Sequence, residues 1–185
     1  VAYENMLLDS NNVGAKFFAG CTKIKEIVIP LGVGTVSYGL GEYEGCTALE
    51  KVTFYSGDEL VYCNSPSFLN CPNLKVIELV YVEDYETDEN GKVTYTQTSQ
   101  AHIATFNGSF FAGTGIEYFY TSSPEIIFGG HDFENSIIKV VVLDAADITM
   151  FGEGDGYGIF SNAKELKEVW IAGGEDGLYF SEDVF

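Results

Sequence analysis

The sequence contains no arginine: all nine basic residues are lysines, and they are outnumbered by 28 aspartates and glutamates. The formal net charge is −19 at pH 7. A chain this acidic repels phosphate backbones, and without arginine it lacks the bidentate guanidinium fork that reads guanine or phosphate. We therefore expect no nucleic-acid partner.

Long apolar runs are also missing, and none approaches the roughly 20 residues that a membrane-spanning helix needs. The opening stretch VAYENMLLDSNN has neither the basic segment nor the apolar segment of a signal peptide. We therefore expect no membrane span. The start at Val1, without an initiator methionine, predicts a trimmed chain or a piece of a longer one. With 185 residues and 46% hydrophobic content, the chain can form one domain with a buried core.

What the sequence does contain is a repeat. Each unit starts at an aromatic anchor, and the anchors are Phe18, Tyr43, Phe68, Phe111, Phe133, Phe160 and Phe185. Their spacings are 25, 25, 43, 22, 27 and 25 residues. A small residue follows each of the first six anchors by three positions, and an aliphatic residue follows by five or six. A fixed period of this length predicts a stack of repeated structural units.

Every unit also contains runs in which apolar residues alternate, which is typical of short strands with one buried face. The first strands carry the pairs Ile27/Ile29, Val52/Phe54, Ile77/Leu79 and Val169/Ile171. The second strands carry Val36/Tyr38, Val61/Cys63, Ala104/Phe106, Ile126/Phe128 and Leu178/Phe180. Gly- and Asp-rich segments such as YSGDE and AGGEDG predict turns between them. One unit cannot bury its own apolar face, but stacked units form a continuous core.

The pattern F-x-G/N-C-x-x-L-K/E-x-I-x-I resembles the BspA-type leucine-rich repeat. Its clearest copies are FAGCTKIKEIVI, YEGCTALEKVTF, FLNCPNLKVIEL and FSNAKELKEVWI, and the resemblance covers residues 13–185. It implies a right-handed solenoid of about six repeats of 22–27 residues, with short parallel strands and little helix. This class of repeat is common in bacterial surface proteins. The resemblance therefore implies an extracellular or cell-surface protein that binds another molecule and is not an enzyme.

The cysteines share the repeat pattern. Cys21, Cys46 and Cys71 occupy the slot that holds Thr114, Ser136 and Ala163 in later units. A slot that accepts these residue types predicts small buried side chains at a tight turn. A disulfide between stacked neighbours stays open as an alternative, because their Cα atoms would be about 5 Å apart. Cys63 falls in a core slot of the second strand. Without a C-x-x-C motif or clustered ligands, we expect no metal site.

The sequence predicts no catalytic residue. His102 and His131 are the only histidines, and no serine lies in a nucleophile motif such as G-x-S-x-G. We interpret His131 and Asp132 as a solvated loop pair. We also expect no cofactor.

The 43-residue spacing predicts an insertion at about residues 80–100. The segments VYVEDYET and KVTYTQT favour a hairpin closed by a two-residue Asn90-Gly91 turn, with Glu89 opposite Lys92. The stretch from Glu86 to Gln97 also resembles part of an EF-hand calcium loop. It lacks the aspartate expected at the first position and the glutamate expected at the last, so the hairpin is preferred.

These observations predict a single leucine-rich repeat domain over residues 1–185, with a partial repeat or cap at residues 1–16. We expect a monomeric, non-catalytic module of a surface or secreted bacterial protein that recognises a protein or a glycan. A structural spacer or stalk is the alternative. Insertions in repeat arrays often gather on the binding face. The candidate contact residues are Tyr81, Tyr85, Tyr95, Tyr118, Tyr120, Tyr157 and Trp170.

Overall fold

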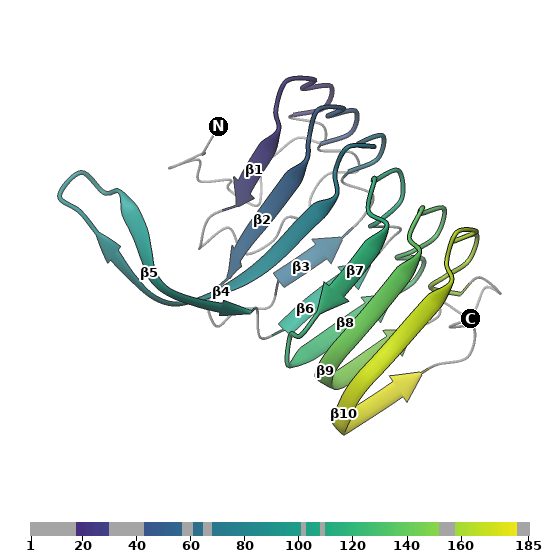
Figure 1. The fold of residues 1–185 in the computed structure, drawn as a ribbon. Helices are drawn as coiled ribbons and strands as arrows, with labels where there is room; N and C mark the ends of the chain where they lie inside the picture. The colour runs from purple at the N-terminus through teal and green to yellow at the C-terminus, as the bar shows by residue number, and fades with distance from the viewer. Residues whose placement is uncertain are drawn as a thin grey trace.

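Ten strands build the described part of the chain, and that part contains no helix (Figure 1). The computed structural model describes residues 18–29, 43–56, 61–64, 68–100, 103–107, 110–151 and 158–180. The predicted cap at residues 1–16 and Tyr157 lie outside these ranges. The strands are β1 (Glu26–Ile29), β2 (Lys51–Ser56), β3 (Val61–Asn64), β4 (Val76–Thr87), β5 (Val93–Gln100), β6 (Ile103–Asn107), β7 (Tyr118–Thr121), β8 (Glu125–Gly129), β9 (Val140–Phe151) and β10 (Glu168–Phe180).

The strands stack into the two faces of a β-solenoid, as the repeat predicted (Figure 1). The front face contains β1, β2, the first part of β4, β7, and the first halves of β9 and β10. The back face contains β3, β6, β8, and the second halves of β9 and β10. Neighbouring turns pair in parallel and in register, so that Val52 lies between Ile27 and Ile77. On the back face Phe106 lies opposite Phe128. The repeat slots are therefore the positions that stack.

The last two turns depart from the expected pattern of two short strands joined by a turn. Both β9 and β10 continue from the front face to the back face as single strands. The first half of β9 pairs with β7, and its second half pairs with β8. In β10 the register with β9 shifts between Gly173 and Gly177. The AGGEDG segment is thus an irregularity within a strand rather than a turn, because a bulge bends a strand without ending its pairing.

Each corner uses one residue in the left-handed backbone conformation, two positions after the aromatic anchor. The φ angles of these residues lie between 54° and 75°. The residues are Gly20, Gly45, Asn70, Gly113, Asn135 and Asn162. Glycine pays no steric penalty there, and asparagine tolerates the conformation better than most residues. This requirement explains why the repeat pattern alternates only between G and N at this slot.

The aromatic anchors form two stacked columns in the core. The first column is Phe18, Tyr43 and Phe68, with centroid distances of 5.6 and 5.3 Å. The second column is Phe111, Phe133 and Phe160, with distances of 4.5 and 5.0 Å. Between the columns, Phe110 packs edge-on against Phe68 and Phe111. Both geometries are favourable for aromatic pairs, so the core stays filled where the stack is interrupted.

The front face is split at this same interruption. Here β4 pairs with β2 on one side and, from Val80 onward, with the antiparallel strand β5 on the other. No pairing joins the described strands β4 and β7. The turns remain joined at the corner, where the N–H of Gly115 donates to the carbonyl of Leu74 at 2.9 Å. They are also joined on the back face, where β3 pairs with β6. The split therefore opens towards the front only.

Candidate binding surface on the front face

Aromatic and valine side chains gather on the outer side of β7, β9 and β10. The registers of these strands form two rows of neighbours across the sheet. We call these two rows the apolar ridge: one is Tyr120, Val142 and Trp170, and the other is Tyr118, Val140 and Glu168. Side chains two positions apart on a strand share a face, so both rows point the same way.

The ridge exposes large apolar groups to solvent. Trp170 is 60% exposed, Tyr118 is 56% exposed and Tyr120 is 48% exposed. The indole Nε1 of Trp170 donates a hydrogen bond of 2.7 Å to the carboxylate of Glu168, which orients the ring. All three exposed residues are among the candidate contact residues named from the sequence. Their role as contact residues stays a prediction.

The other half of the front face, on β1, β2 and β4, is more polar. The carboxylate of Glu78 lies 2.8 Å from the ammonium of Lys51 and accepts a hydrogen bond of 3.2 Å from the hydroxyl of Thr53. Thr53 alternates with the inward pair Val52/Phe54, yet it is only 3% exposed. Its outward side chain is held between neighbouring strands by this network, which a period-two pattern does not reveal.

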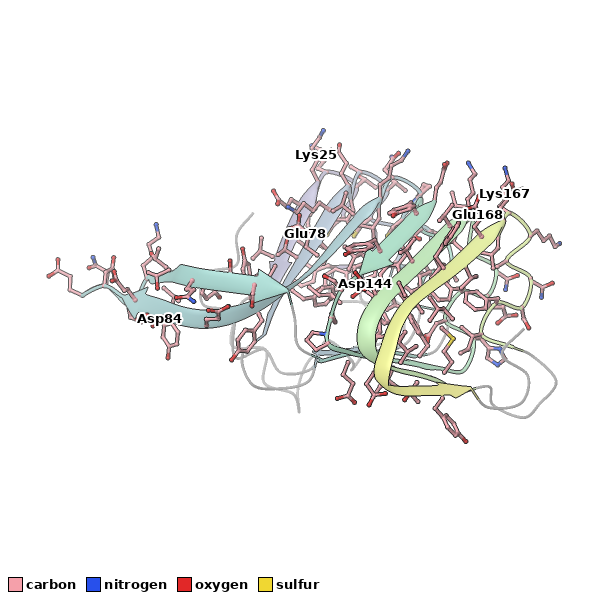
Figure 2. All side chains as sticks on the ribbon, turned by 60° about the horizontal axis from the view of Figure 1, so that its bottom comes forward. Lys25, Glu78, Asp84, Asp144, Lys167 and Glu168 are labelled. Atoms are coloured by element: carbon pink, nitrogen blue, oxygen red, sulfur yellow. The ribbon has the colours of Figure 1, made fainter. Side chains whose placement is uncertain are left out.

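A row of charged residues marks the edge of the front face where the strands begin. The residue directly before each front strand is charged, and the sign of the charge alternates from one turn to the next except at the last step. We call this row the charge ladder: Lys25, Glu50, Lys75, Glu117, Lys139 and Lys167. Lys25 and Glu50 are 2.8 Å apart, and Lys139 and Glu117 are 2.7 Å apart. The hydrogen bond to Lys139 lowers the pKa of the Glu117 carboxyl. Figure 2 shows Lys25 and Lys167 along the same edge.

The insertion forms an arm, residues 82–98, that projects from the body beyond the front strands (Figures 1 and 2). Every side chain from Glu83 to Thr94 is exposed. Of the three tyrosines predicted as contact residues here, Tyr85 is 52% exposed, whereas Tyr81 and Tyr95 are half-buried. The ring of Tyr95 packs against Tyr55 on β2 with a centroid distance of 4.4 Å. Tyr95 therefore helps to fasten the base of the arm.

The turn of the arm differs from the predicted two-residue Asn90-Gly91 turn. Thr87 pairs with Val93, the N–H of Asp88 donates to the carbonyl of Lys92, and Gly91 has a φ of 80°. This is a three-residue loop with a left-handed glycine at its end. The carboxylate of Asp88 accepts the N–H groups of Asn90 and Lys92, each at 2.9 Å. That side chain favours the longer loop, so Glu89 and Lys92 do not form the expected facing pair.

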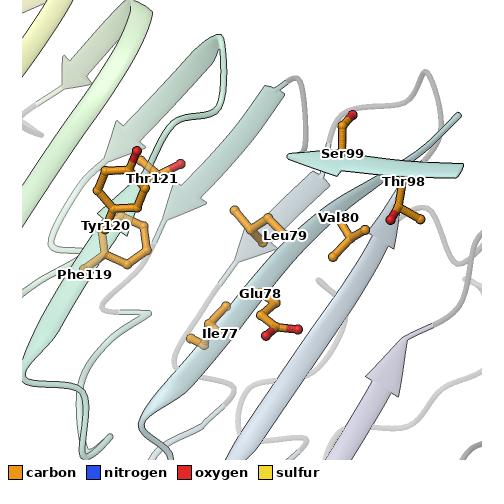
Figure 3. Close-up of a pocket in the computed structure, with 9 residues that line it drawn as sticks. All are labelled: Ile77, Glu78, Leu79, Val80, Thr98, Ser99, Phe119, Tyr120 and Thr121. Carbon is orange, nitrogen blue, oxygen red and sulfur yellow. The ribbon is translucent and has the colours of Figure 1, made fainter.

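A groove of about 430 Å³ lies between β4 and β7, at the split in the front face (Figure 3). Ile77, Leu79 and Phe119 supply apolar side chains to its lining. Glu78 and Tyr120 come from the same two strands, and Thr98 and Ser99 of β5 close the end next to the arm. The sequence predicted the insertion and the strands, but not that the insertion would separate two turns of the solenoid.

The column cysteines are structural thiols. Cys46 and Cys71 are fully buried, Cys21 is half-buried, and all three are free, so the alternative of a disulfide among them is not realised. The Sγ of Cys71 donates to the carbonyl of Tyr43 at 3.1 Å, and burial raises the pKa of this thiol to about 11. In the same slot Thr114 donates its hydroxyl to the carbonyl of Phe111. The slot thus selects a small side chain, and at Cys46, Cys71, Thr114 and Ser136 that side chain also donates a hydrogen bond. Among the described residues, no cluster of His, Cys, Asp and Glu could hold a metal ion.

The interpretation of His131 and Asp132 as a solvated loop pair is wrong. Asp132 is fully buried, and its Oδ2 accepts the N–H of Gly129 at 2.9 Å. His131 is half-buried, with its Nδ1 3.8 Å from the carboxylate of Glu134. A carboxylate that ties β8 to the next corner is a structural element of the turn, and no nucleophile motif accompanies it.

The repeat geometry agrees with the comparison against protein families. The family described as the BspA type leucine-rich repeat region matches residues 11–139, in six copies. The chain belongs to this family. Its match extends over more than half of the sequence and includes the first five described corners. No curated protein and no solved structure matches the chain. In the part of the chain that the structure describes, no helix is long and apolar enough to cross a membrane.

Proposed function

We propose that this BspA-type repeat domain is a non-catalytic binding module of a surface or secreted bacterial protein, and that its partner is a protein or a glycan. The observation that carries the proposal is the apolar ridge, where Tyr118, Tyr120 and Trp170 stand exposed in adjoining strands. Contiguous exposed apolar surface on a soluble protein usually marks an interaction site. Tyrosine and tryptophan also supply large contact areas with few rotatable bonds.

The rest of the front face supports recognition over a purely structural role. A spacer needs a uniformly solvated surface, which would place charged residues along the outer side of every strand. Instead, half-buried Val140 and Val142 link the exposed rings, and Glu168 is the one charged residue among the six that form the ridge. The arm adds a second contact element, because Tyr85 is held away from the body on a paired hairpin.

The proposal is tested by probing immobilised glycans and extracellular-matrix proteins with the wild-type chain and with Trp170→Ala. Tyr179→Ala is the matched control, because Tyr179 is 55% exposed on the back-face half of β10. We expect Trp170→Ala to weaken binding by about tenfold or more, as for an aromatic hot spot. Tyr179→Ala should leave binding unchanged. Undetectable binding by the wild-type chain, or equal loss in both variants, would argue for the spacer role.

A third variant, in which residues 83–97 are replaced by Asn-Gly, measures the contribution of the arm. Val82 and Thr98 already face each other in the register, so a two-residue turn can join them. Weaker binding would assign the arm to the contact surface. Unchanged binding would restrict the contact surface to the ridge.

A further inference from the structure

The groove lies between two strand edges that face each other. On the front face β4 is paired with β2 and β7 is paired with β9, and the opposite sides of these strands border the groove. Within the described residues, no strand pairs with β4 at Ile77 on the groove side, and none pairs with β7 on its groove side. Such edges are templates for another strand.

The direction of the backbone groups follows from the hydrogen bonds on the paired sides. The N–H of Val76 donates to Glu50 on the β2 side, so the N–H and carbonyl of Ile77 point towards the groove. The carbonyl of Glu117 accepts from Val140 on the β9 side, so the backbone groups of Tyr118 and Tyr120 also point towards the groove. Ile77 on one edge and Tyr118 and Tyr120 on the other therefore present donors and acceptors to the same space.

The side chains repeat the period of a strand. Leu79 and Phe119 belong to the core, with 6% exposure each, and together with Ile77 they give the groove an apolar floor. Glu78 and Tyr120 alternate with these residues and stand at the rim. Figure 3 shows the residues of β4 on one side of the space and those of β7 on the other. A strand placed here would continue the sheet with one apolar side chain in every two pointing inward.

We propose that the groove binds an extended peptide segment of the partner, which adds as a strand between β4 and β7 and joins the two halves of the front face. The segment has apolar residues at alternate positions and lysine or arginine at the end beside the arm. This inference rests on the proposed binding function and specifies the chemistry of the partner. Backbone hydrogen bonds on both sides of the segment supply affinity, and the floor supplies selectivity for alternating apolar side chains.

The cationic end follows from the charge of the arm. The arm carries Glu83, Asp84, Glu86, Asp88 and Glu89 against a single lysine, Lys92. Thr98 and Ser99, which close one end of the groove, continue directly into this acidic hairpin. Complementary charge directs association and fixes orientation. The same argument disfavours a second copy of the chain as the occupant, because two molecules of net charge −19 repel each other.

The test uses fluorescein-labelled octapeptides with Val, Leu, Phe or Tyr at alternate positions, threonine between them, and a lysine pair at one end or the other. Controls replace the lysine pair by glutamates or methylate the backbone nitrogens. Fluorescence anisotropy with the intact chain should detect binding of at least one lysine peptide. Substitution by glutamates should weaken it by about tenfold or more, and methylation should weaken it as well.

Tyr120→Pro and Tyr120→Ala isolate the backbone contribution. Both remove the ring, but only proline removes the N–H that points into the groove, and an edge position facing away from the paired strand tolerates proline. We expect Tyr120→Pro to bind at least about tenfold more weakly than Tyr120→Ala, with unchanged circular dichroism for both. Hydrogen exchange should show that peptide binding protects the amides of Tyr118 and Tyr120 in the wild-type chain.

Absence of binding by every lysine peptide, equal affinity of the two Tyr120 variants, or protection only outside the groove would overturn the strand-addition proposal. Array binding that depends on Trp170 would then still stand, so the failure of this inference is distinguishable from failure of the proposed function. Absence of both the array binding and the peptide binding would reject the proposed function and the strand-addition proposal together.

Discussion

At the residue scale, a buried thiol in this protein occupies the position of a buried hydroxyl. Cys46 and Cys71 donate to the anchor carbonyls of the preceding turn, whereas Thr114 and Ser136 donate to the anchor carbonyls of their own turn. The slot is too enclosed for a larger side chain, and a donor satisfies a carbonyl that already accepts one backbone N–H. Cysteine here is a packing residue with a weak hydrogen bond.

The raised pKa of Cys71 predicts a loss of stability at alkaline pH. In the unfolded chain this thiol ionises near its ordinary pKa of 9.0, whereas in the folded chain it ionises only near pH 11. Below pH 9 both states hold the proton, so the contribution is fully present there, and it is lost as the pH rises through 11. We expect the free energy of unfolding to fall by on the order of 2 kcal/mol over this window, measured by urea denaturation.

Cys71→Ser provides the control, because serine fits the slot in the unit at Phe133 and does not titrate. The variant should fold and should show a smaller alkaline loss than the wild-type chain. An identical pH dependence in both proteins would contradict the assignment of the loss to Cys71.

The sequence predicts the burial of the Cys71 thiol but not that of the Asp132 carboxylate, for a physical reason. Three cysteines in one column, replaced elsewhere by Thr, Ser and Ala, show the size limit of the slot even without coordinates. Asp132 has no such column of equivalents, and an aspartate shortly after a glycine pair looks like part of a solvated loop. Its burial depends on the N–H of Gly129, which only the folded turn brings within reach of the carboxylate.

At the scale of the element, the corners of the third and fourth turns pack more tightly than the earlier ones. A Cβ on Gly113 would lie 2.7 Å from the backbone nitrogen of Asn70, whereas a Cβ on Gly20 would meet nothing within 4 Å. Both glycines have the same left-handed conformation. Space rather than backbone conformation therefore distinguishes the two corners.

This difference predicts opposite tolerance to asparagine, which three other corners already use. Gly113→Asn should lower the free energy of unfolding by about 1–3 kcal/mol, because the backbone of the neighbouring turn must shift. Gly20→Asn should change it by less than about 1 kcal/mol. Urea denaturation of the two variants measures the contrast. Equal destabilisation would mean that the corner conformation, and not the clash, dominates.

The elements themselves were predictable where each residue obeys the repeat. The buried positions of Ile27, Val52 and Phe54 on the front face, and of Phe106, Ile126 and Phe128 on the back face, follow directly from the alternating pattern. The uninterrupted course of β10 did not, because glycine and aspartate at a bulge look like glycine and aspartate in a turn. The groove was equally invisible, since it results from β5 pairing with the side of β4 that another turn would otherwise occupy.

At the scale of the whole molecule, like charges outweigh the ion pairs. The described Lys–Glu pairs of the front face are solvent-accessible, and such pairs add little to the stability of the fold. Repulsion among the remaining carboxylates of a chain with net charge −19 opposes the folded state. Salt screens both the attraction within ion pairs and the repulsion among carboxylates, so the larger of the two determines whether added salt raises or lowers the Tm.

We therefore expect the Tm to rise when sodium chloride is increased from about 0.01 M to about 0.15 M, over which the Debye length falls from about 30 to about 8 Å. Differential scanning calorimetry measures this shift. Chloride is preferred to sulfate, because sulfate also strengthens apolar burial. A fall in Tm would mean that the charge ladder contributes more than the repulsion costs.

In the charge ladder, the sign of the charge also depends on whether a turn is odd or even in the stack. Lys25, Glu50, Lys75, Glu117 and Lys139 alternate in sign from turn to turn, and stacked strands are only about 4.8 Å apart. Duplication or loss of one internal turn would bring two like charges together, whereas the same change made by two turns would keep every attraction. Rearrangement of this part of the solenoid is therefore least costly in steps of two.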